Sequence, residues 1–246
     1  MTTPPAPKPS LSARDRLIVA LDVASAAEAQ KLVASIGNTA AIYKIGKQLF
    51  TAEGPGLVRD LVSSGRKVFL DLKYHDIPNT IASAVRSASD LKVNMLTVHA
   101  SGGSKMLRAA AQAAAESSAR PLVLAVTVLT SMADEDLREI GIAGTAQDQV
   151  IRLAKLAQKA GIGGLVASPS ELKALRQTLG QEMKIVTPGV RPVGSDKGDQ
   201  ARVATPAEAI ANGADYIVVG RPITAAADPA AAAKAILEEI QKSGRQ

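Results

Sequence analysis

The chain contains no cysteine and no tryptophan, and only 2% of its 246 residues are aromatic. Without cysteine there is no disulfide, no thiolate nucleophile and no cysteine-ligated metal. Two histidines are too few for a multi-histidine metal site. The scarcity of aromatic residues also removes the stacking platforms typical of proteins that bind single-stranded nucleic acid. We therefore expect no metal and no nucleic-acid partner, and the absence of cysteine fits an expected cytoplasmic location.

Long apolar runs are missing as well. No stretch approaches the roughly 18 consecutive apolar residues of a membrane-spanning helix, so no membrane partner is expected. Residues 1–13 contain four prolines and lack the apolar central run of a secretion signal. With little to bury, they are predicted to be a disordered leader. The hydrophobic content of 46% is ample for one core, and residues 14–246 are predicted to form a single domain.

What the chain does have is a regular alternation of apolar, β-branched runs with alanine-rich segments of helical periodicity. The predicted strands are 16–22, 41–46, 67–71, 94–100, 121–128, 163–168, 183–189 and 215–220. Strands separated by helices pair in parallel, because the connection must cross over. Eight such units in about 250 residues favour a closed (β/α)8 TIM barrel. No GxGxxG motif follows the first strand, which argues against a dinucleotide-binding sheet. A last helix is expected after Asp228, its cap, with Pro229 in the first turn.

Charged residues lie at the carboxyl ends of the first three predicted strands. Side chains alternate along a strand, so Asp22, Lys44 and Asp71 are expected to point into the barrel. Lys73 joins them if extended backbone continues two residues past Asp71. Barrel enzymes carry their chemistry at this carboxyl rim. Any one of these charges could belong to a structural salt-bridge network. Four charged side chains of alternating sign that all point into the barrel favour a functional array instead.

The alternation has a chemical consequence for the lysines. A lysine between carboxylates stays protonated, because nearby opposite charge favours its charged form. Such a side chain is a cation and a proton donor. Lysines that form Schiff bases need the reverse environment, either desolvated or beside another cation. The pattern therefore argues against a Schiff-base aldolase.

The last two predicted strands indicate an anion site. Gly220 allows a close backbone approach, Arg221 offers a guanidinium fork, and Pro222 suits the first turn of a helix. Barrels commonly bind phosphate after strands 7 and 8. Arg191 and Gln200 lie in a loop of about twenty residues after strand 7, a length typical of a lid or a disordered segment. Together with the net charge of +6, these residues favour an anionic substrate.

Other polar residues at strand ends carry weaker signals. His75 and His99 are interpreted as structural residues of the rim, since a lone histidine there is more often hydrogen-bonded than catalytic. Thr130 and Ser131 follow strand 5 and are candidates for contacting a polar ring. A hydroxyl after a strand means little by itself.

The order of the motifs resembles the orotidine 5'-phosphate decarboxylase family. The motifs are IVALD (18–22), YKIG (43–46), DLKYHDIPNT (71–80), TVLTS (127–131), PGVRP (188–192), GDQARVATP (198–206) and VVGRPI (218–223). They cover nearly the whole chain, and DLKYHDIPNT is the most specific. The resemblance implies a phosphate-binding (β/α)8 barrel that converts orotidine 5'-monophosphate to uridine 5'-monophosphate and CO2 in pyrimidine synthesis. It also implies a homodimer that needs no metal or organic cofactor.

The resemblance assigns roles to individual residues. Lys73 would be the general acid that protonates C6 of the pyrimidine, and Asp71 would lie beside the departing carboxylate. Asp76 and Thr80 would reach into the partner subunit's site and complete an Asp–Lys–Asp–Lys array with Lys44. The remaining implied contacts are Asp22 and Lys44 to the ribose, Thr130 to the pyrimidine, and Arg191, Gln200, Gly220 and Arg221 to the phosphate.

Two alternatives stay open. Sugar-phosphate decarboxylases and hexulose-phosphate synthases of the same superfamily also carry Asp-x-Lys-x-x-Asp after strand 3, but they use magnesium and enediolate chemistry. DLKYHDIPNT and the long DQARVATP segment favour the nucleotide enzyme. The other alternative is a barrel that binds nucleotides without turnover. An intact charge array argues against it, since buried charges are costly to keep.

Overall fold

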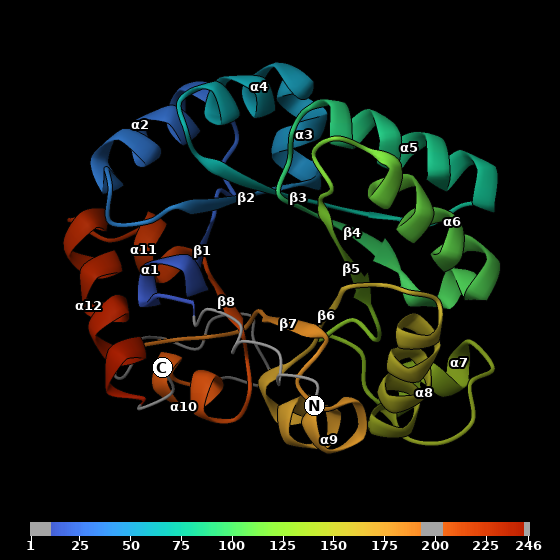
Figure 1. Cartoon of the computed structure of the whole chain (residues 1–246). Coiled ribbons are helices and arrows are strands. Elements are labelled where there is room, and N and C mark those ends of the chain that lie inside the picture. Colours follow the sequence, from blue (N-terminus) through green and yellow to red (C-terminus); the bar gives the residue numbers. More distant parts are fainter. Residues whose placement is uncertain (1–10, 193–203, 244–246) are drawn as a thin grey trace, which may run out of the picture.

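The chain folds as a closed barrel of parallel strands, β1 to β8 in sequence order (Figure 1). The computed structural model describes residues 11–192 and 204–243. The predicted (β/α)8 barrel is confirmed. Seven of the eight predicted strands contain an observed one, and β3 runs three residues past its predicted end. The strands are β1 (Leu17–Ala20), β2 (Ile42–Gly46), β3 (Lys67–Tyr74), β4 (Met95–His99), β5 (Leu122–Val126), β6 (Gly164–Val166), β7 (Lys184–Thr187) and β8 (Tyr216–Val219).

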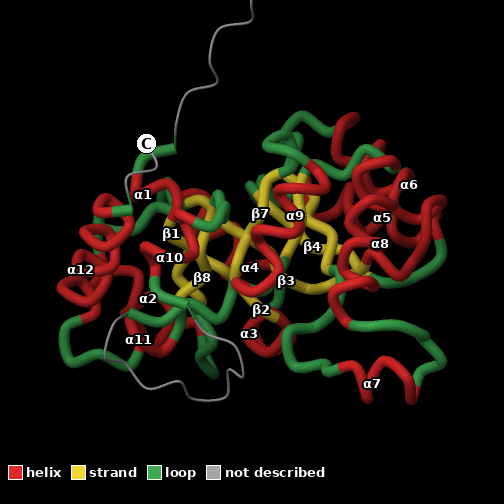
Figure 2. The backbone as a smooth tube through the Cα atoms, turned by 90° about the horizontal axis from the view of Figure 1, so that it is seen from below, coloured by secondary structure: helices red, strands yellow, loops and turns green. Residues whose placement is uncertain are grey.

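Helices return the chain from one strand to the next along the outside of the barrel (Figures 1 and 2). The longer ones are α2 (Ala26–Ile36), α4 (Pro55–Ser63), α5 (Pro78–Asp90), α6 (Gly103–Glu116), α8 (Ala146–Lys159), α9 (Leu172–Leu179) and α12 (Pro229–Lys242). The shorter ones are α1 (Ala13–Arg16), α3 (Lys47–Glu53), α7 (Asp134–Glu139), α10 (Pro206–Ala211), α11 (Arg221–Thr224) and the 3-10 turns η1 (Ala100–Gly102) and η2 (Pro169–Glu171). Figure 2 shows α7 standing out from the ring of helices. None of the helices in the described ranges combines the length and apolarity that a membrane crossing requires.

Alternate side chains of the strands divide the core into two layers. Ile18 and Ala20 of β1, Ile42 of β2 and Phe69 of β3 belong to a small cluster inside the barrel. Their sequence neighbours, such as Val19, belong to a larger cluster between the strands and the helices. The inward phase predicted for the first three strands is therefore confirmed, and it sets which rim residues point into the barrel.

Side-chain caps mark where the first and last helices begin. The Asp228 carboxylate accepts from the N–H of Ala231 at 3.0 Å, which confirms the predicted start of α12. Ser12 caps α1, and Leu11 packs against the cluster inside the barrel. Residues 1–10 lie outside the described residues, so the leader stays a prediction there. Two residues at the end of the expected leader, Leu11 and Ala13, instead pack against the core.

A buried ion pair lies at the amino end of the barrel. Arg176 of α9 and Asp215, just before β8, approach to 2.5 Å, with side chains only 8% and 12% exposed. Arg176 also donates to the carbonyls of Gly213 at 2.7 Å and Met183 at 2.8 Å. The Asp215 carboxylate accepts from the N–H of Ile185 at 2.9 Å. The pair thus ties α9 to the starts of β7 and β8.

We expect Arg176→Met to lower the free energy of unfolding by about 2–4 kcal/mol. The buried Asp215 carboxylate then keeps only the Lys184 ammonium group, 3.3 Å away on a side chain that is 35% exposed, and two backbone carbonyls lose a donor. Arg138→Met is the matched control, since Arg138 and Glu135 are 59% and 85% exposed and lie 3.8 Å apart. The control is expected to lose less than about 1 kcal/mol. Urea unfolding measures both values. Equal losses in the two variants would contradict a stabilising role for the buried pair.

Candidate active site

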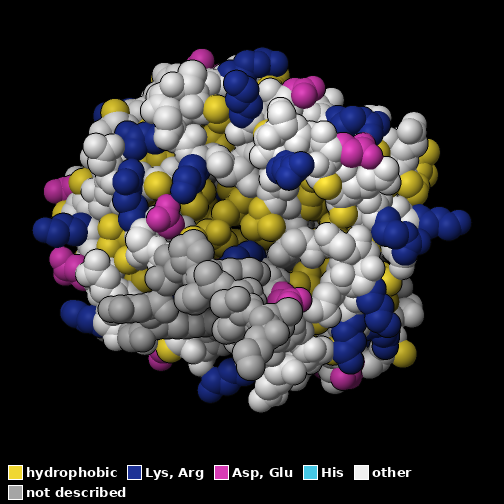
Figure 3. Space-filling model, viewed as in Figure 1, with side chains coloured by type: hydrophobic (Ala, Val, Ile, Leu, Met, Phe, Trp, Pro, Cys, Tyr) yellow, Lys and Arg dark blue, Asp and Glu magenta, His cyan; other side chains and the backbone are white. Residues whose placement is uncertain are grey.

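The carboxyl ends of the strands surround a cavity of about 510 Å³. Its floor is apolar, and hydrophobic side chains are visible at the bottom of the hollow near the centre of this face (Figure 3). Charged and polar side chains stand around the rim above this floor. An apolar floor excludes water and strengthens electrostatic interactions at the rim. The floor residues include Phe69, Val126, Val166, Val186 and Val218.

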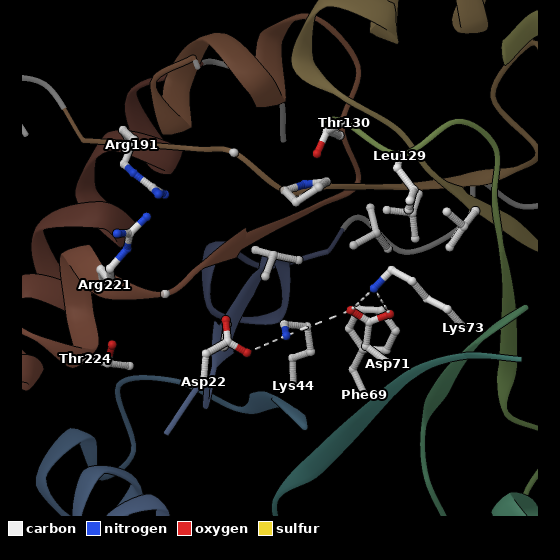
Figure 4. A pocket seen from close by; sticks show the side chains of 18 of the residues that line it. Asp22, Lys44, Phe69, Asp71, Lys73, Leu129, Thr130, Arg191, Arg221 and Thr224 are labelled. Carbon is white, nitrogen blue, oxygen red and sulfur yellow. Dashed lines mark hydrogen bonds and ion pairs between the residues drawn. The ribbon is translucent and has the colours of Figure 1, made fainter. Parts of the chain in front are cut away.

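Four charged side chains of alternating sign form a row along one side of the cavity (Figure 4). Lys44 Nζ lies 2.8 Å from Asp22 Oδ1 and 3.9 Å from Asp71 Oδ2. Lys73 Nζ donates to both oxygens of Asp71 at 2.8 Å. Lys44 lies on β2, Asp71 and Lys73 lie on β3, and Asp22 follows the end of β1. The structure thus brings together the four charges that were predicted at the rim.

Burial is unequal along this row. The side chains of Lys44, Asp71 and Lys73 are only 11%, 13% and 26% exposed, whereas that of Asp22 is 61% exposed. Buried charges are tolerated when they are paired, and the row contains two cations and two anions. Its inner three members form a fixed, poorly hydrated array, with Asp22 at the solvent-exposed end.

Lys73 reaches the row by a route that simple alternation does not predict. Leu70 pairs with Leu96 and Tyr74 pairs with Val98, so three residues of β3 face Thr97 alone. Within this bulge Lys73 has a φ of 52°, a left-handed conformation that costs a residue with a side chain about 1–3 kcal/mol. The strand continues to Tyr74, but the condition set for Lys73, extended backbone for two residues past Asp71, is not met at Lys73 itself. The bulge, and not strand alternation, aims the lysine.

Thr97 is a residue of this site that the sequence analysis did not single out. It lies on β4 and is fully buried. Its hydroxyl accepts from the backbone N–H of Lys73 at 2.8 Å and donates to Asp71 Oδ1 at 3.0 Å. The available signal was its place two residues from Met95, which faces the barrel interior. A polar residue in that phase indicates a contact at the rim.

Two arginines lie at the other end of the cavity. Arg191 follows β7 and Arg221 begins α11, and both line the cavity together with Gly220. Figure 4 shows their guanidinium groups close together, on the far side of the cavity from Lys73. Two guanidinium groups in this arrangement suit a phosphate. Gln200, the other expected phosphate ligand, lies outside the described residues.

Comparison with known proteins agrees with this arrangement. The model of the orotidine 5'-phosphate decarboxylase / HUMPS family matches residues 15–236. The chain belongs to this family. An orotidine 5'-phosphate decarboxylase of Moorella thermoacetica is 54% identical over 94% of this chain and 94% of its own length. One from Halorhodospira halophila is 55% identical over 93% of this chain and 97% of its own length.

A solved structure supports the same assignment. The orotidine 5'-phosphate decarboxylase of Lactobacillus acidophilus superposes with a TM-score of 0.82 at 39% sequence identity. The match covers 91% of this chain and 98% of that one. The resemblance inferred from the motifs is therefore confirmed for the family and for the barrel.

The family motif after β3 also contains two residues that the cavity of this chain does not include. Asp76 and Thr80 are exposed, and neither is among the described residues that line the cavity. Asp76 Oδ1 accepts from the N–H of Ile77 at 2.6 Å. Ile77 itself is 67% exposed, unusually high for a large apolar side chain. This segment therefore presents a carboxylate, a hydroxyl and an apolar side chain at the surface.

Thr130 and the histidines occupy different surroundings. Thr130 lines the cavity across from the charged row (Figure 4), and Ser131 lines a smaller hollow beside it. The rings of His75 and His99 lie 5.4 Å apart, and neither residue lines the cavity. Burial lowers the pKa of His99, with a further contribution from the charge of His75. A neutral, half-buried His99 fits its structural interpretation. Within the described ranges, no group of three or more His, Cys, Asp or Glu side chains is arranged to hold a metal ion.

Proposed function

We propose that the chain converts orotidine 5'-monophosphate to uridine 5'-monophosphate and CO2, as a cytoplasmic step of pyrimidine synthesis. The observation that carries this proposal is the charged row from Asp22 to Lys73, facing two arginines across one cavity. The substrate carries a phosphate at one end and a carboxylated ring at the other. The names of the relatives from Moorella thermoacetica and Halorhodospira halophila agree with this substrate.

The chemistry requires a cation near C6 of the pyrimidine. Loss of CO2 leaves an electron pair in the plane of the ring, where the π system cannot delocalise it. A preorganised ammonium group stabilises that charge as it develops, without needing to reorient. Lys73 meets this requirement, because both oxygens of Asp71 hold its Nζ at 2.8 Å. The same group then donates its proton to C6 as the general acid.

Asp71 has two roles in this mechanism. It fixes the ammonium group of Lys73, and its own negative charge lies beside the substrate carboxylate. Repulsion between the two carboxylates disfavours the bound substrate and disappears as CO2 leaves. Because Asp71 is only 13% exposed, solvent screens this repulsion weakly. The remaining proposed contacts are Asp22 and Lys44 to the ribose hydroxyls, Thr130 to the pyrimidine, and Arg191, Gln200, Gly220 and Arg221 to the phosphate.

The geometry disfavours the magnesium-dependent sugar-phosphate chemistry found in the same superfamily. A divalent cation in this row would have to lie between the carboxylates of Asp22 and Asp71. Lys44 Nζ already lies there, 2.8 Å from one carboxylate and 3.9 Å from the other. A magnesium ion in the same place would be repelled by the ammonium group.

Substrate choice tests this proposal. The protein is incubated with orotidine 5'-monophosphate, and separately with a keto-sugar phosphate and magnesium. We expect uridine 5'-monophosphate from the first mixture and no reaction in the second. Turnover of the sugar phosphate alone would support the magnesium-dependent alternative. A folded sample that binds uridine 5'-monophosphate but turns over neither compound would support a non-catalytic barrel.

We also propose that the chain acts as a homodimer with shared active sites. Asp76 and Thr80 would enter the partner's cavity, since both are exposed and lie outside the cavity of their own chain. The exposed Ile77 between them supports an interface here, because large apolar side chains are enriched in the cores of interfaces. Asp76 would then extend the charged row beyond Lys73.

Mixing two inactive variants tests this sharing. In a mixed dimer of Asp76→Ala and Lys73→Ala chains, one of the two sites contains both natural residues. Random exchange in a two-fold dimer therefore restores about one quarter of the wild-type activity. The control mixture, Asp71→Ala with Lys73→Ala, is expected to stay inactive, since both residues belong to one chain's cavity. No restoration after demonstrated subunit exchange would show that each site is built from a single chain.

A further inference from the structure

The bulge in β3 creates a structural requirement at Lys73. The side chain must reach the cavity from a left-handed backbone with a φ of 52°. The regular ladder between β3 and β4 is interrupted here, because three residues of β3 face Thr97 alone. A backbone N–H in such a place needs a specific partner, since strand pairing no longer supplies one. Thr97 supplies it, at 2.8 Å.

The direction of each hydrogen bond at Thr97 follows from chemistry. An ionised carboxylate only accepts, so the single hydroxyl hydrogen of Thr97 is donated to Asp71 Oδ1 at 3.0 Å. The lone pairs of the hydroxyl remain for the N–H of Lys73. Thr97 is 0% exposed, so bulk water has no access from which to replace either contact. One buried hydroxyl therefore joins the backbone of Lys73 to the carboxylate of Asp71.

These contacts close a ring. The Lys73 N–H donates to Thr97, Thr97 donates to Asp71, and Asp71 accepts the ammonium group of Lys73 on both oxygens. The ring fixes the backbone position and the side-chain end of the same lysine. Thr97 is not among the described residues that line the cavity, so its effect on a bound substrate must act through the other two.

We propose that Thr97 is a positioning residue for the decarboxylation. Its hydroxyl holds Asp71 and the backbone of Lys73 in the one arrangement that places the ammonium group at the reacting carbon. This inference rests on the proposed function, because it assigns Thr97 to the same reaction. Removing the hydroxyl should therefore lower kcat and leave binding of the nucleotide nearly unchanged.

Three variants test this role. Thr97→Val removes the hydroxyl and keeps the shape, whereas Thr97→Ser keeps the hydroxyl. Thr187→Val is the matched control, because Thr187 is 0% exposed at the end of β7 and its hydroxyl has no partner within the described residues. Wild type and variants are compared in kcat and KM for orotidine 5'-monophosphate, affinity for uridine 5'-monophosphate, and unfolding midpoint.

For Thr97→Val we expect kcat to fall about 10- to 100-fold, as small misplacements of catalytic groups do. Its KM and its affinity for uridine 5'-monophosphate should stay within about threefold of wild type, because the phosphate contacts lie at the other end of the cavity. Thr97→Ser and Thr187→Val should both keep kcat within about threefold of wild type.

The proposal is overturned if the kcat of Thr97→Val stays within threefold of wild type. It is also overturned if Thr187→Val lowers kcat as much as Thr97→Val does. If Thr97→Val does not fold, the pair Thr97→Ala and Thr187→Ala replaces the two valine variants. The wild-type assay separates this inference from the proposed function. If wild type does not convert orotidine 5'-monophosphate, both the proposed function and the role of Thr97 are wrong. If wild type converts it and Thr97→Val converts it equally fast, only the role of Thr97 is wrong.

Discussion

Lys73→Ala protein is expected to convert orotidine 5'-monophosphate at least about 10⁴-fold more slowly than wild type while still binding uridine 5'-monophosphate. The substitution removes both the cation that stabilises the developing charge and the proton donor, each typically responsible for about 10²-fold or more. Binding persists because the arginines that suit the phosphate lie across the cavity from Lys73 (Figure 4). Steady-state absorbance measures turnover, and titration calorimetry measures binding.

Lys67→Ala is the matched control for this experiment. Lys67 begins the same strand and also pairs with a carboxylate, that of Asp15 at 3.0 Å, but the pair lies at the amino end of β3 and is partly exposed. Its turnover should stay within about twofold of wild type, since exposed ion pairs contribute little. A Lys73→Ala protein with turnover within tenfold of wild type would remove Lys73 from its proposed role.

Arg221→Ala is expected to lower kcat/KM for orotidine 5'-monophosphate by about 10- to 150-fold. A charge-assisted hydrogen bond contributes about 1.5–3 kcal/mol, which corresponds to that range. Part of the loss should appear in kcat, because binding energy from a remote phosphate can support the reacting end of the substrate. Arg221 lines the end of the cavity opposite the charged row, so the loss should not involve the ammonium groups directly.

Orotidine without its phosphate provides the control for Arg221. If Arg221 binds the phosphate, wild type and Arg221→Ala should turn over orotidine at the same low rate. The difference between the two substrates then isolates the contact between Arg221 and the phosphate. Equal losses on both substrates, or no loss on either, would place the anion site elsewhere.

The barrel and most of the charged row could be predicted from the sequence, because both follow from backbone geometry. Alternation along β1 and β2 is local, so Asp22 and Lys44 could be placed from their own strands alone. The strand–helix alternation likewise predicted the closed barrel that the structure shows. Short helices such as α3 and α7 were not predicted, because they span fewer than two turns and show no clear period.

The geometry around Lys73 could not be predicted, because it depends on two strands at once. The bulge exists only as a mismatch between β3 and β4, and neither strand encodes it separately. Thr97 became visible as part of the site only when this pairing was known. The parts assigned to Asp76 and Thr80 depend on a second subunit, and they stay predictions. Gln200 stays a prediction as well, since it lies outside the described residues.

The most direct test of the account is turnover of orotidine 5'-monophosphate in D2O with excess EDTA. Absorbance follows the conversion, and NMR of the product reports the hydrogen isotope at C6. We predict complete conversion at the rate seen without EDTA, with one deuterium at C6 delivered by the exchanged ammonium group of Lys73. Loss of activity with EDTA, or a folded sample that yields no uridine 5'-monophosphate, would contradict decarboxylation by protein side chains without a metal.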